Sequence, residues 1–85
     1  MNTFDYVVVD EVGLHARPAS QLVKFLEGID SKVSVTKGEK TADAKRLFSL
    51  MGLAIKEGET ITFTLEGENA PTDIVALEQF CKETF

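Results

Sequence analysis

The segment from Thr60 to Glu66 constrains the fold most, because apolar and hydroxyl side chains alternate along it. In an extended strand Ile61, Phe63 and Leu65 lie on one side and the threonines lie on the other. Such a strand has one face in a core and one face toward water, as in an antiparallel sheet that is covered on one side. We therefore expect a sheet that packs against helices with one face only.

Three further segments predict the remaining strands, from β-branched and aromatic residues that alternate with polar ones. They cover residues 3–9, 32–36 and 40–42, and Val33 and Val35 are expected to point inward. In the first segment Phe4, Tyr6 and Val8 share one face, but the alternation is imperfect because Val7 and Val9 lie on the other. A turn around Gly38 joins the last two segments, and a glycine supplies the positive φ that a tight turn often needs. These two strands are therefore predicted to form a β-hairpin.

Apolar residues at helical spacing predict three helices. They are expected at residues 16–27, at 45–53 and after residue 69. The apolar stripe of the first helix consists of Ala19, Leu22, Val23 and Leu26. The apolar stripe of the third consists of Ile74, Leu77, Phe80 and Cys81. Asp43 is expected to cap the second helix and Asn69 the third. The order of strands and helices predicts a two-layer α+β domain, with an antiparallel four-stranded sheet and three helices on one face.

Length and charge exclude several classes of function. A chain of 85 residues supplies one small core, so we expect a single domain over residues 1–85. The net charge of −5 argues against nucleic-acid binding, and no apolar run reaches the roughly 20 residues of a membrane span. No secretory signal is recognisable, and one cysteine cannot form an internal disulfide. We therefore expect a cytoplasmic location.

His15 is the only histidine, and it lies where the predicted first strand gives way to the first helix. Pro18 fits only the first turn of that helix, which places His15 at or just before the helix N-terminus. Unpaired N–H groups and the partial positive charge of a helix start attract phosphate or sulfate. The same field and the guanidinium of Arg17 disfavour a charged ring, and a neutral imidazole is a nucleophile. We therefore expect a nucleophile next to a binding site for the anion that it would carry.

Plainer interpretations of these residues remain open. A histidine in such a loop is commonly a polar surface or capping residue, and Arg17 can be a solvated side chain. A single histidine excludes a histidine-rich metal cluster, and no HExxH motif occurs. Cys81 falls in the apolar stripe of the last helix, where we expect it to be buried and unreactive.

The predicted second helix is unusual, because its apolar residues lie nearly all around it. They are Leu47, Phe48, Leu50, Met51 and Leu53. A surface helix normally buries one stripe only. Either this helix is covered on two sides or part of it is exposed for a partner. Since so thin a domain has little protein to cover both sides, we expect the exposed alternative.

The string Gly13-Leu14-His15-Ala16-Arg17-Pro18-Ala19 resembles the active-site motif of HPr, the histidine-containing phosphocarrier family of the sugar phosphotransferase system. The stretch Lys45-Arg46-Leu47-Phe48-Ser49-Leu50 is similar to a second stretch of that family. The resemblance extends over nearly the whole chain and implies the strand order 1-4-2-3. It also implies that Nδ1 of His15 accepts a phosphoryl group from enzyme I and passes it to enzyme II A domains.

The resemblance further implies the roles of individual residues. Arg17 would stabilise the phosphoryl charge, and the backbone N–H groups of Ala16 and Arg17 would bind its oxygens. The residues expected to contact partners are Ser20, Lys24, Lys45, Arg46, Leu47, Phe48 and Met51. We expect a monomeric carrier rather than a classical enzyme. It is expected to bind no cofactor, metal or nucleic acid and not to associate with a membrane.

Three positions depart from relatives in this family. Many HPr proteins of low-GC Gram-positive bacteria carry a regulatory phosphoserine where this chain has Arg46, so we predict no phosphorylation there. Glu27 and Ser49 stand where some relatives carry lysine, so the local set of basic residues, Arg17, Lys24, Lys45 and Arg46, is expected to be weaker here. Two other functions remain open: a docking homologue that binds partners without moving phosphate, and a small module that binds a metabolite. The downstream sugars and enzyme II partners are not fixed by the sequence.

Overall fold

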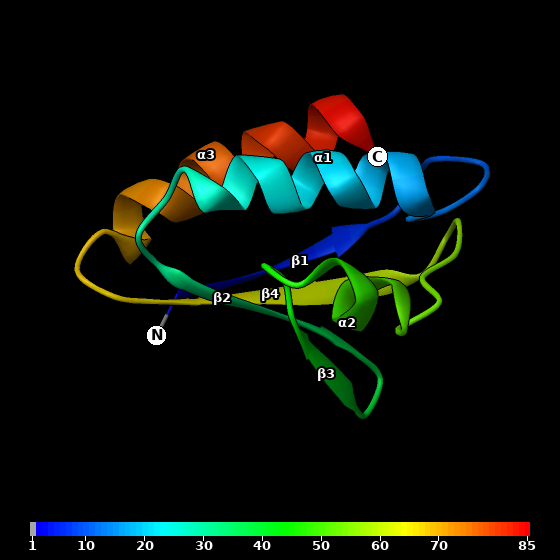
Figure 1. The fold of residues 1–85 in the computed structure, drawn as a ribbon, viewed down its shortest axis with the longest axis horizontal. Helices are drawn as coiled ribbons and strands as arrows, with labels where there is room; N and C mark the ends of the chain where they lie inside the picture. Colours follow the sequence, from blue (N-terminus) through cyan, green and yellow to red (C-terminus); the bar gives the residue numbers. More distant parts are fainter. Residues whose placement is uncertain (1) are drawn as a thin grey trace.

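A computed structural model describes residues 2–85 as a four-stranded antiparallel sheet with three helices. The elements are β1 (Asn2–Val7), α1 (Ala16–Glu27), β2 (Lys32–Lys37), β3 (Lys40–Asp43), α2 (Leu47–Met51), β4 (Thr60–Glu66) and α3 (Ala70–Thr84). The strand order is β1-β4-β2-β3, which confirms the two-layer α+β prediction and the expected order. Helices α1 and α3 lie side by side over one face of the sheet, and α2 packs beside α1 and β3 (Figure 1).

The alternation in β4 produces the core as predicted. Ile61, Phe63 and Leu65 are fully buried, and Phe63 stacks on Phe4 of β1 with ring centroids 5.1 Å apart. Antiparallel pairing places β4 between β1 and β2, so its apolar side chains lie at the centre of the sheet. Removing these side chains from water is the main source of the stability of the domain.

Aromatic contacts and one hydrogen bond hold the two long helices in place. Phe25 of α1 stacks on Phe80 of α3, with ring centroids 4.5 Å apart. The hydroxyl of Tyr6 in β1 donates a hydrogen bond of 3.0 Å to the backbone oxygen of Cys81 in α3. Because α3 is fixed to both the sheet and α1, the start of α1 has a defined position relative to the end of α3.

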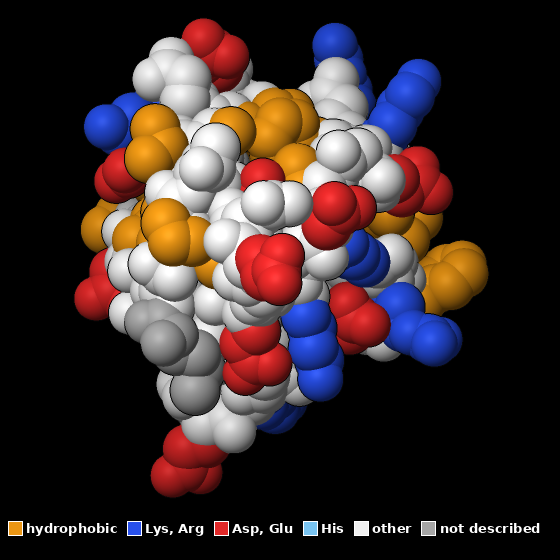
Figure 2. Space-filling view, turned by 90° about the vertical axis from the view of Figure 1, so that its left-hand side faces the viewer, with side chains coloured by type: hydrophobic (Ala, Val, Ile, Leu, Met, Phe, Trp, Pro, Cys, Tyr) orange, Lys and Arg blue, Asp and Glu red, His pale blue; other side chains and the backbone are white. Residues whose placement is uncertain are grey.

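The other face of the sheet is open, as the threonines of β4 predicted. Threonine hydroxyls on this face make hydrogen bonds across the strands. The Oγ1 atoms of Thr36 and Thr41 lie 2.9 Å apart, and Oγ1 of Thr62 donates to Oδ1 of Asp5 at 2.7 Å. The face on the left-hand side of Figure 1 carries interspersed acidic and basic side chains, and no histidine is visible on it (Figure 2). Among residues 2–85 no helix is long and apolar enough to cross a membrane.

Two local predictions were wrong. Strand β1 ends at Val7 instead of continuing to Val9, whose N–H donates to the backbone oxygen of Phe85. Helix α2 covers Leu47–Met51 instead of residues 45–53, and Asp43 does not cap it, because Asp43 ends β3 and its carboxylate accepts the N–H of Lys45.

The side chain of Asn69 makes no capping hydrogen bond, although Asn69 occupies the N-cap position of α3. Its amide contacts the carboxylate of Asp30 at 3.4 Å instead. The start of α3 is held by Asp73, which accepts a 2.6 Å hydrogen bond from the buried hydroxyl of Ser31. Asp73 also lies in the first turn, where a negative charge favours the helix dipole.

Candidate functional site

His15 is the N-cap residue of α1, as the sequence predicted. Its backbone is extended (φ −84°, ψ −173°), and its carbonyl accepts the first helical hydrogen bond, from Ala19 at 2.9 Å. The imidazole makes no capping hydrogen bond, and 37% of the side chain is exposed. The ring is therefore accessible to a reacting group and is not used to hold the helix together.

The helix start leaves two backbone donors next to this ring. The N–H groups of Ala16 and Arg17 have no hydrogen-bond partner within residues 2–85, and both residues are exposed. Pro18 follows and has no N–H to satisfy, which is why proline is tolerated there. Unpaired amides and the helix dipole together form a site for an anion. The exposed Arg17 side chain adds a full positive charge to the same turn.

The loop before α1 is pressed against the segment that precedes β4, and this contact fixes the position of His15. The N–H of Leu14 donates to the backbone oxygen of Ile55 at 3.0 Å. Gly13 has φ +78°, and a Cβ atom on it would lie 2.4 Å from the same oxygen. Only glycine fits here, because the backbones touch and the positive φ disfavours other residues. Leu14 is buried, so the residue before His15 is anchored in the core.

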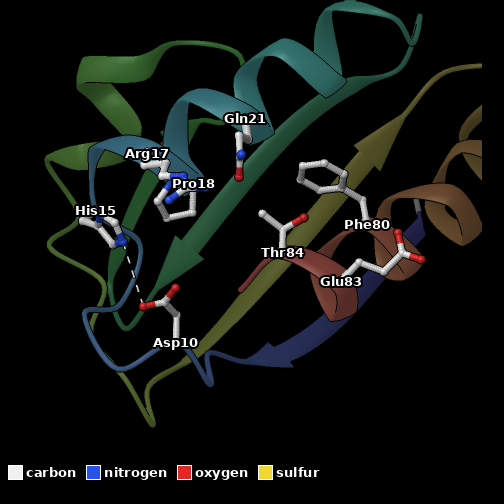
Figure 3. A pocket seen from close by; sticks show the side chains of 8 residues that line it. All are labelled: Asp10, His15, Arg17, Pro18, Gln21, Phe80, Glu83 and Thr84. Atoms are coloured by element: carbon white, nitrogen blue, oxygen red, sulfur yellow. Dashed lines mark ion pairs between the residues drawn. The ribbon is translucent and has the colours of Figure 1, made fainter.

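Asp10 also belongs to the site, and sequence reasoning missed it. Its Oδ1 lies 3.9 Å from Nε2 of His15 and accepts the N–H of Val12 at 2.9 Å (Figure 3). The only signal in the sequence is an aspartate three residues before Gly13, which is typical of a turn and does not indicate a contact with the ring. The carboxylate of Asp10 therefore contacts Nε2 of the ring and not Nδ1.

His15 lies at one end of an open groove of about 500 Å³ between the start of α1 and the end of α3 (Figure 3). The lining residues are Asp10, His15, Arg17, Pro18, Gln21, Phe80, Glu83 and Thr84. Most of them carry polar groups, and Phe80 supplies part of the floor. An extended surface of this kind gives a second protein access to the ring.

The predicted apolar contact surface is partly exposed, in agreement with the second of the two alternatives for this helix. In α2 the side chain of Leu50 is buried, whereas Phe48 is 87% exposed and Met51 is 37% exposed. Leu47 is half-buried. We call Leu47, Phe48 and Met51 the α2 patch. An exposed phenylalanine of this kind is typical of a surface that binds another protein.

The predicted basic residues come from two segments: Arg17 and Lys24 lie in α1, whereas Lys45 and Arg46 directly precede α2. Ser20 and Lys24 are exposed on α1. Lys45 is half-buried, and its ammonium donates to the backbone oxygen of Ile29 at 2.9 Å, beyond the far end of α1 from His15. Arg46 lies 3.6 Å from the carboxylate of Asp43. Arg17 is therefore the predicted cation that lies in the same turn as the unpaired amides.

Other reactive groups are excluded from this site. Cys81 is buried, and burial followed by the charge of Glu78 raises the pKa of its thiol to about 12, so it stays protonated at neutral pH. Within residues 2–85 no cluster of histidine, cysteine and acidic side chains has the makings of a metal site. The exposed imidazole of His15, the guanidinium of Arg17 and the unpaired amides of the helix start are the groups that this site offers to a ligand.

The chain is similar to known proteins over nearly its whole length. The model of a family described as "PTS HPr component phosphorylation site" matches residues 2–83. The phosphocarrier protein HPr of Lysinibacillus sphaericus is 40% identical over 83 residues, which are 98% of this chain and 94% of the relative. The solved structure of a Mycoplasma histidine-containing phosphocarrier protein superposes with a TM-score of 0.92 at 36% identity, over 98% of this chain and 94% of that one.

The same type of domain also occurs inside longer proteins. The chain is 35% identical over 83 residues to the phosphoryl donor subunit DhaM of a PEP-dependent dihydroxyacetone kinase from Providencia stuartii. Those residues cover 98% of this chain and 17% of DhaM.

Proposed function

The chain belongs to the HPr phosphocarrier family of the phosphotransferase system, and from this premise we propose that Nδ1 of His15 accepts a phosphoryl group from phosphorylated enzyme I and passes it to enzyme II A domains. The protein is a covalent intermediate between two enzymes rather than an enzyme that turns over a substrate. We place it in the cytoplasm as a monomer.

The proposed transfer needs no group outside the two proteins. The lone pair on Nδ1 of His15 attacks the phosphorus, and a nitrogen–phosphorus bond forms while the bond to the donor atom breaks. The electron pair of the broken bond stays with the donor. In the second transfer the acceptor attacks the phosphorus, and the electron pair of the nitrogen–phosphorus bond returns to Nδ1. Imidazole suits both steps because it is a good nucleophile and, when it carries a proton on the other nitrogen, a good leaving group.

The start of α1 stabilises the charge that moves with the phosphorus. The unpaired N–H groups of Ala16 and Arg17 are donors for phosphoryl oxygens, and the guanidinium of Arg17 adds a charge-assisted contact. These donors are fixed by the helix and by the contact between Gly13 and Ile55, so they do not reorganise when the group arrives. This preorganisation lowers the barrier in both directions, as a carrier requires.

Partner contacts complete the proposal. The α2 patch supplies apolar area, with Phe48 as its most exposed member. Exposed cations on α1, Arg17 and Lys24, favour encounters with acidic partner surfaces that weaken as salt rises. Ser20 is exposed on the same helix and flanks this contact. We assign Lys45 and Arg46 to the edge of the interface, because each already has a partner within the domain.

The observation that carries the proposal is the exposed ring of His15 next to two unpaired helix amides. The test is incubation of the protein with enzyme I and phosphoenolpyruvate, followed by intact-mass measurement. We expect an acid-labile gain of one phosphoryl group, its loss on addition of an enzyme II A domain, and no gain in His15→Ala. A folded protein that gains nothing from several enzymes I, yet binds them, would be a docking homologue without phosphotransfer.

A further inference from the structure

We propose that Asp10 is a positioning residue for phosphoryl transfer, whose carboxylate holds the proton of His15 on Nε2 so that the lone pair stays on Nδ1. The inference rests on the proposed function, because it concerns the same histidine. It assigns a role to a residue outside the motif that extends from Gly13 to Pro18.

The first observation is the direction in which the carboxylate faces. Oδ1 of Asp10 lies 3.9 Å from Nε2 of His15, and the dashed line in Figure 3 marks this pair. This separation is longer than a direct hydrogen bond, but contacts of catalytic groups are often long without a bound partner and shorten in the complex. The two side chains are 37% and 29% exposed, so the docked partner protein would remove much of the remaining water.

The second observation is that Asp10 is held in place by its backbone and its side chain. Its N–H donates to the backbone oxygen of Phe85 at 3.1 Å, and its carbonyl accepts the N–H of Gly13 at 2.9 Å. Its Oδ1 accepts the N–H of Val12 at 2.9 Å, which leaves further lone pairs of the carboxylate for the ring. The orientation of the carboxylate is therefore fixed before any partner binds.

The third observation is that neighbouring residues do not provide an equivalent acceptor. Val12 lies closer to His15 in sequence, but its side chain is a hydrocarbon and is 67% exposed. Glu83 lines the same groove, and its carboxylate accepts a hydrogen bond from Gln79 at 2.9 Å. Among residues 2–85, Asp10 supplies the carboxylate that lies within ion-pair distance of the ring.

The chemical consequence follows from the two nitrogens of imidazole. A neutral ring has one N–H and one lone pair, and an acceptor beside one nitrogen favours the proton there. With the proton on Nε2, the lone pair of Nδ1 attacks phosphorus, and the phosphorylated ring becomes a cation that the carboxylate of Asp10 stabilises. When the acceptor takes the phosphoryl group, the electron pair returns to Nδ1 and neutral imidazole leaves. The proton stays on Nε2 throughout, so neither transfer waits for a proton to move.

The test uses Asp10→Asn, which keeps the shape of the side chain and an oxygen for the N–H of Val12 but removes the charge. Glu83→Gln is the matched control, because it removes a carboxylate from the same groove. Nitrogen NMR of the imidazole in the unphosphorylated protein should show a smaller fraction of Nε2–H in Asp10→Asn and no change in Glu83→Gln. The kcat of transfer to an enzyme II A domain should fall about two- to five-fold in Asp10→Asn with KM unchanged, the range for a partly exposed ion pair.

The outcomes separate this inference from the proposed function. An unchanged fraction of Nε2–H in Asp10→Asn, or equal losses of kcat in both variants, would overturn the role of Asp10. Normal phosphorylation of the wild type would still support the carrier proposal in that case. If the wild type accepts no phosphoryl group, the carrier proposal fails, and the ring nitrogens still decide whether Asp10 fixes the proton. Asp10→Ser, which keeps a short acceptor for the turn, must give the same shift as Asp10→Asn.

Discussion

Gly13 offers the sharpest test of how the loop before α1 is built, because the chain supplies a matched control. Gly13 and Gly58 have nearly the same backbone conformation, with φ +78° and φ +83°. A Cβ atom on Gly58 meets nothing within 4 Å, whereas a Cβ atom on Gly13 lies 2.4 Å from the backbone oxygen of Ile55 and 2.7 Å from Cα of Lys56. Comparison of Gly13→Ala with Gly58→Ala therefore separates the close contact from the cost of positive φ.

The expected magnitudes follow from these contacts. The left-handed conformation costs an alanine about 1–2 kcal/mol, and part of this cost is offset because alanine also reduces the entropy of the unfolded chain. Gly58→Ala should therefore lower the free energy of unfolding by about 1 kcal/mol. In Gly13→Ala the backbone must move by about 1 Å to reach ordinary contact. That movement weakens the hydrogen bond from Leu14 to Ile55 and the burial of Leu14, which together add about 2 kcal/mol.

Urea unfolding of the two variants and the wild type measures the difference. We expect a total loss of about 3 kcal/mol for Gly13→Ala at an unchanged m-value, which corresponds to a Tm lower by roughly 12–24 °C. The rate of phosphoryl acceptance should also fall in Gly13→Ala at temperatures where the variant is folded, because the loop carries His15. Equal losses of stability in the two variants would refute the claim that the Gly13 contact positions the site.

Two further perturbations test the docking surface and the segment that supports the loop. Phe48→Ala should change the free energy of unfolding by less than about 0.5 kcal/mol, since the side chain is 87% exposed. The same variant should raise KM for partner proteins about ten-fold. Leu50→Ala, at a buried position of the same helix, should instead lower the free energy of unfolding by about 2–5 kcal/mol. An unchanged KM in Phe48→Ala would remove Phe48 from the interface. Hydrogen bonds from the Lys56 backbone and then the Lys37 side chain hold the pKa of Glu59 below its ordinary value of 4.5. Glu59 therefore stabilises the fold above pH 4.5 and loses this effect as the pH falls through the lowered pKa of the folded state. The urea midpoints of the wild type and Glu59→Gln should converge on acidification. A difference between the two midpoints that does not change with pH would contradict a stabilising role of the Glu59 charge.

Local patterns predicted those elements whose residues agree with their surroundings. The limits of α1 and β4 match the structure because helical spacing in one and strict alternation in the other coincide with the buried face. The position of His15 at the helix start followed from Pro18, which fits few other places. The strand order came from the family resemblance and not from any local pattern.

The predictions that failed depend on contacts between distant segments. Asp43 looked like a helix cap, but pairing with Ser34 extends β3 through Asp43, and this shortens α2 at its start. Asp10 looked like an ordinary loop residue, because its backbone is held by a hydrogen bond that its N–H donates to the carbonyl of Phe85, at the other end of the described chain. Such contacts arise from packing of the whole domain, and no spacing rule encodes them.

The most direct test of the carrier claim is to identify the atom that holds the phosphoryl group. NMR of the isotope-labelled, phosphorylated protein measures the scalar coupling between phosphorus and each ring nitrogen of His15. We predict coupling to Nδ1, with Nε2 still carrying its proton. Phosphorus bonded to Nε2, or located on any other residue, would contradict the account.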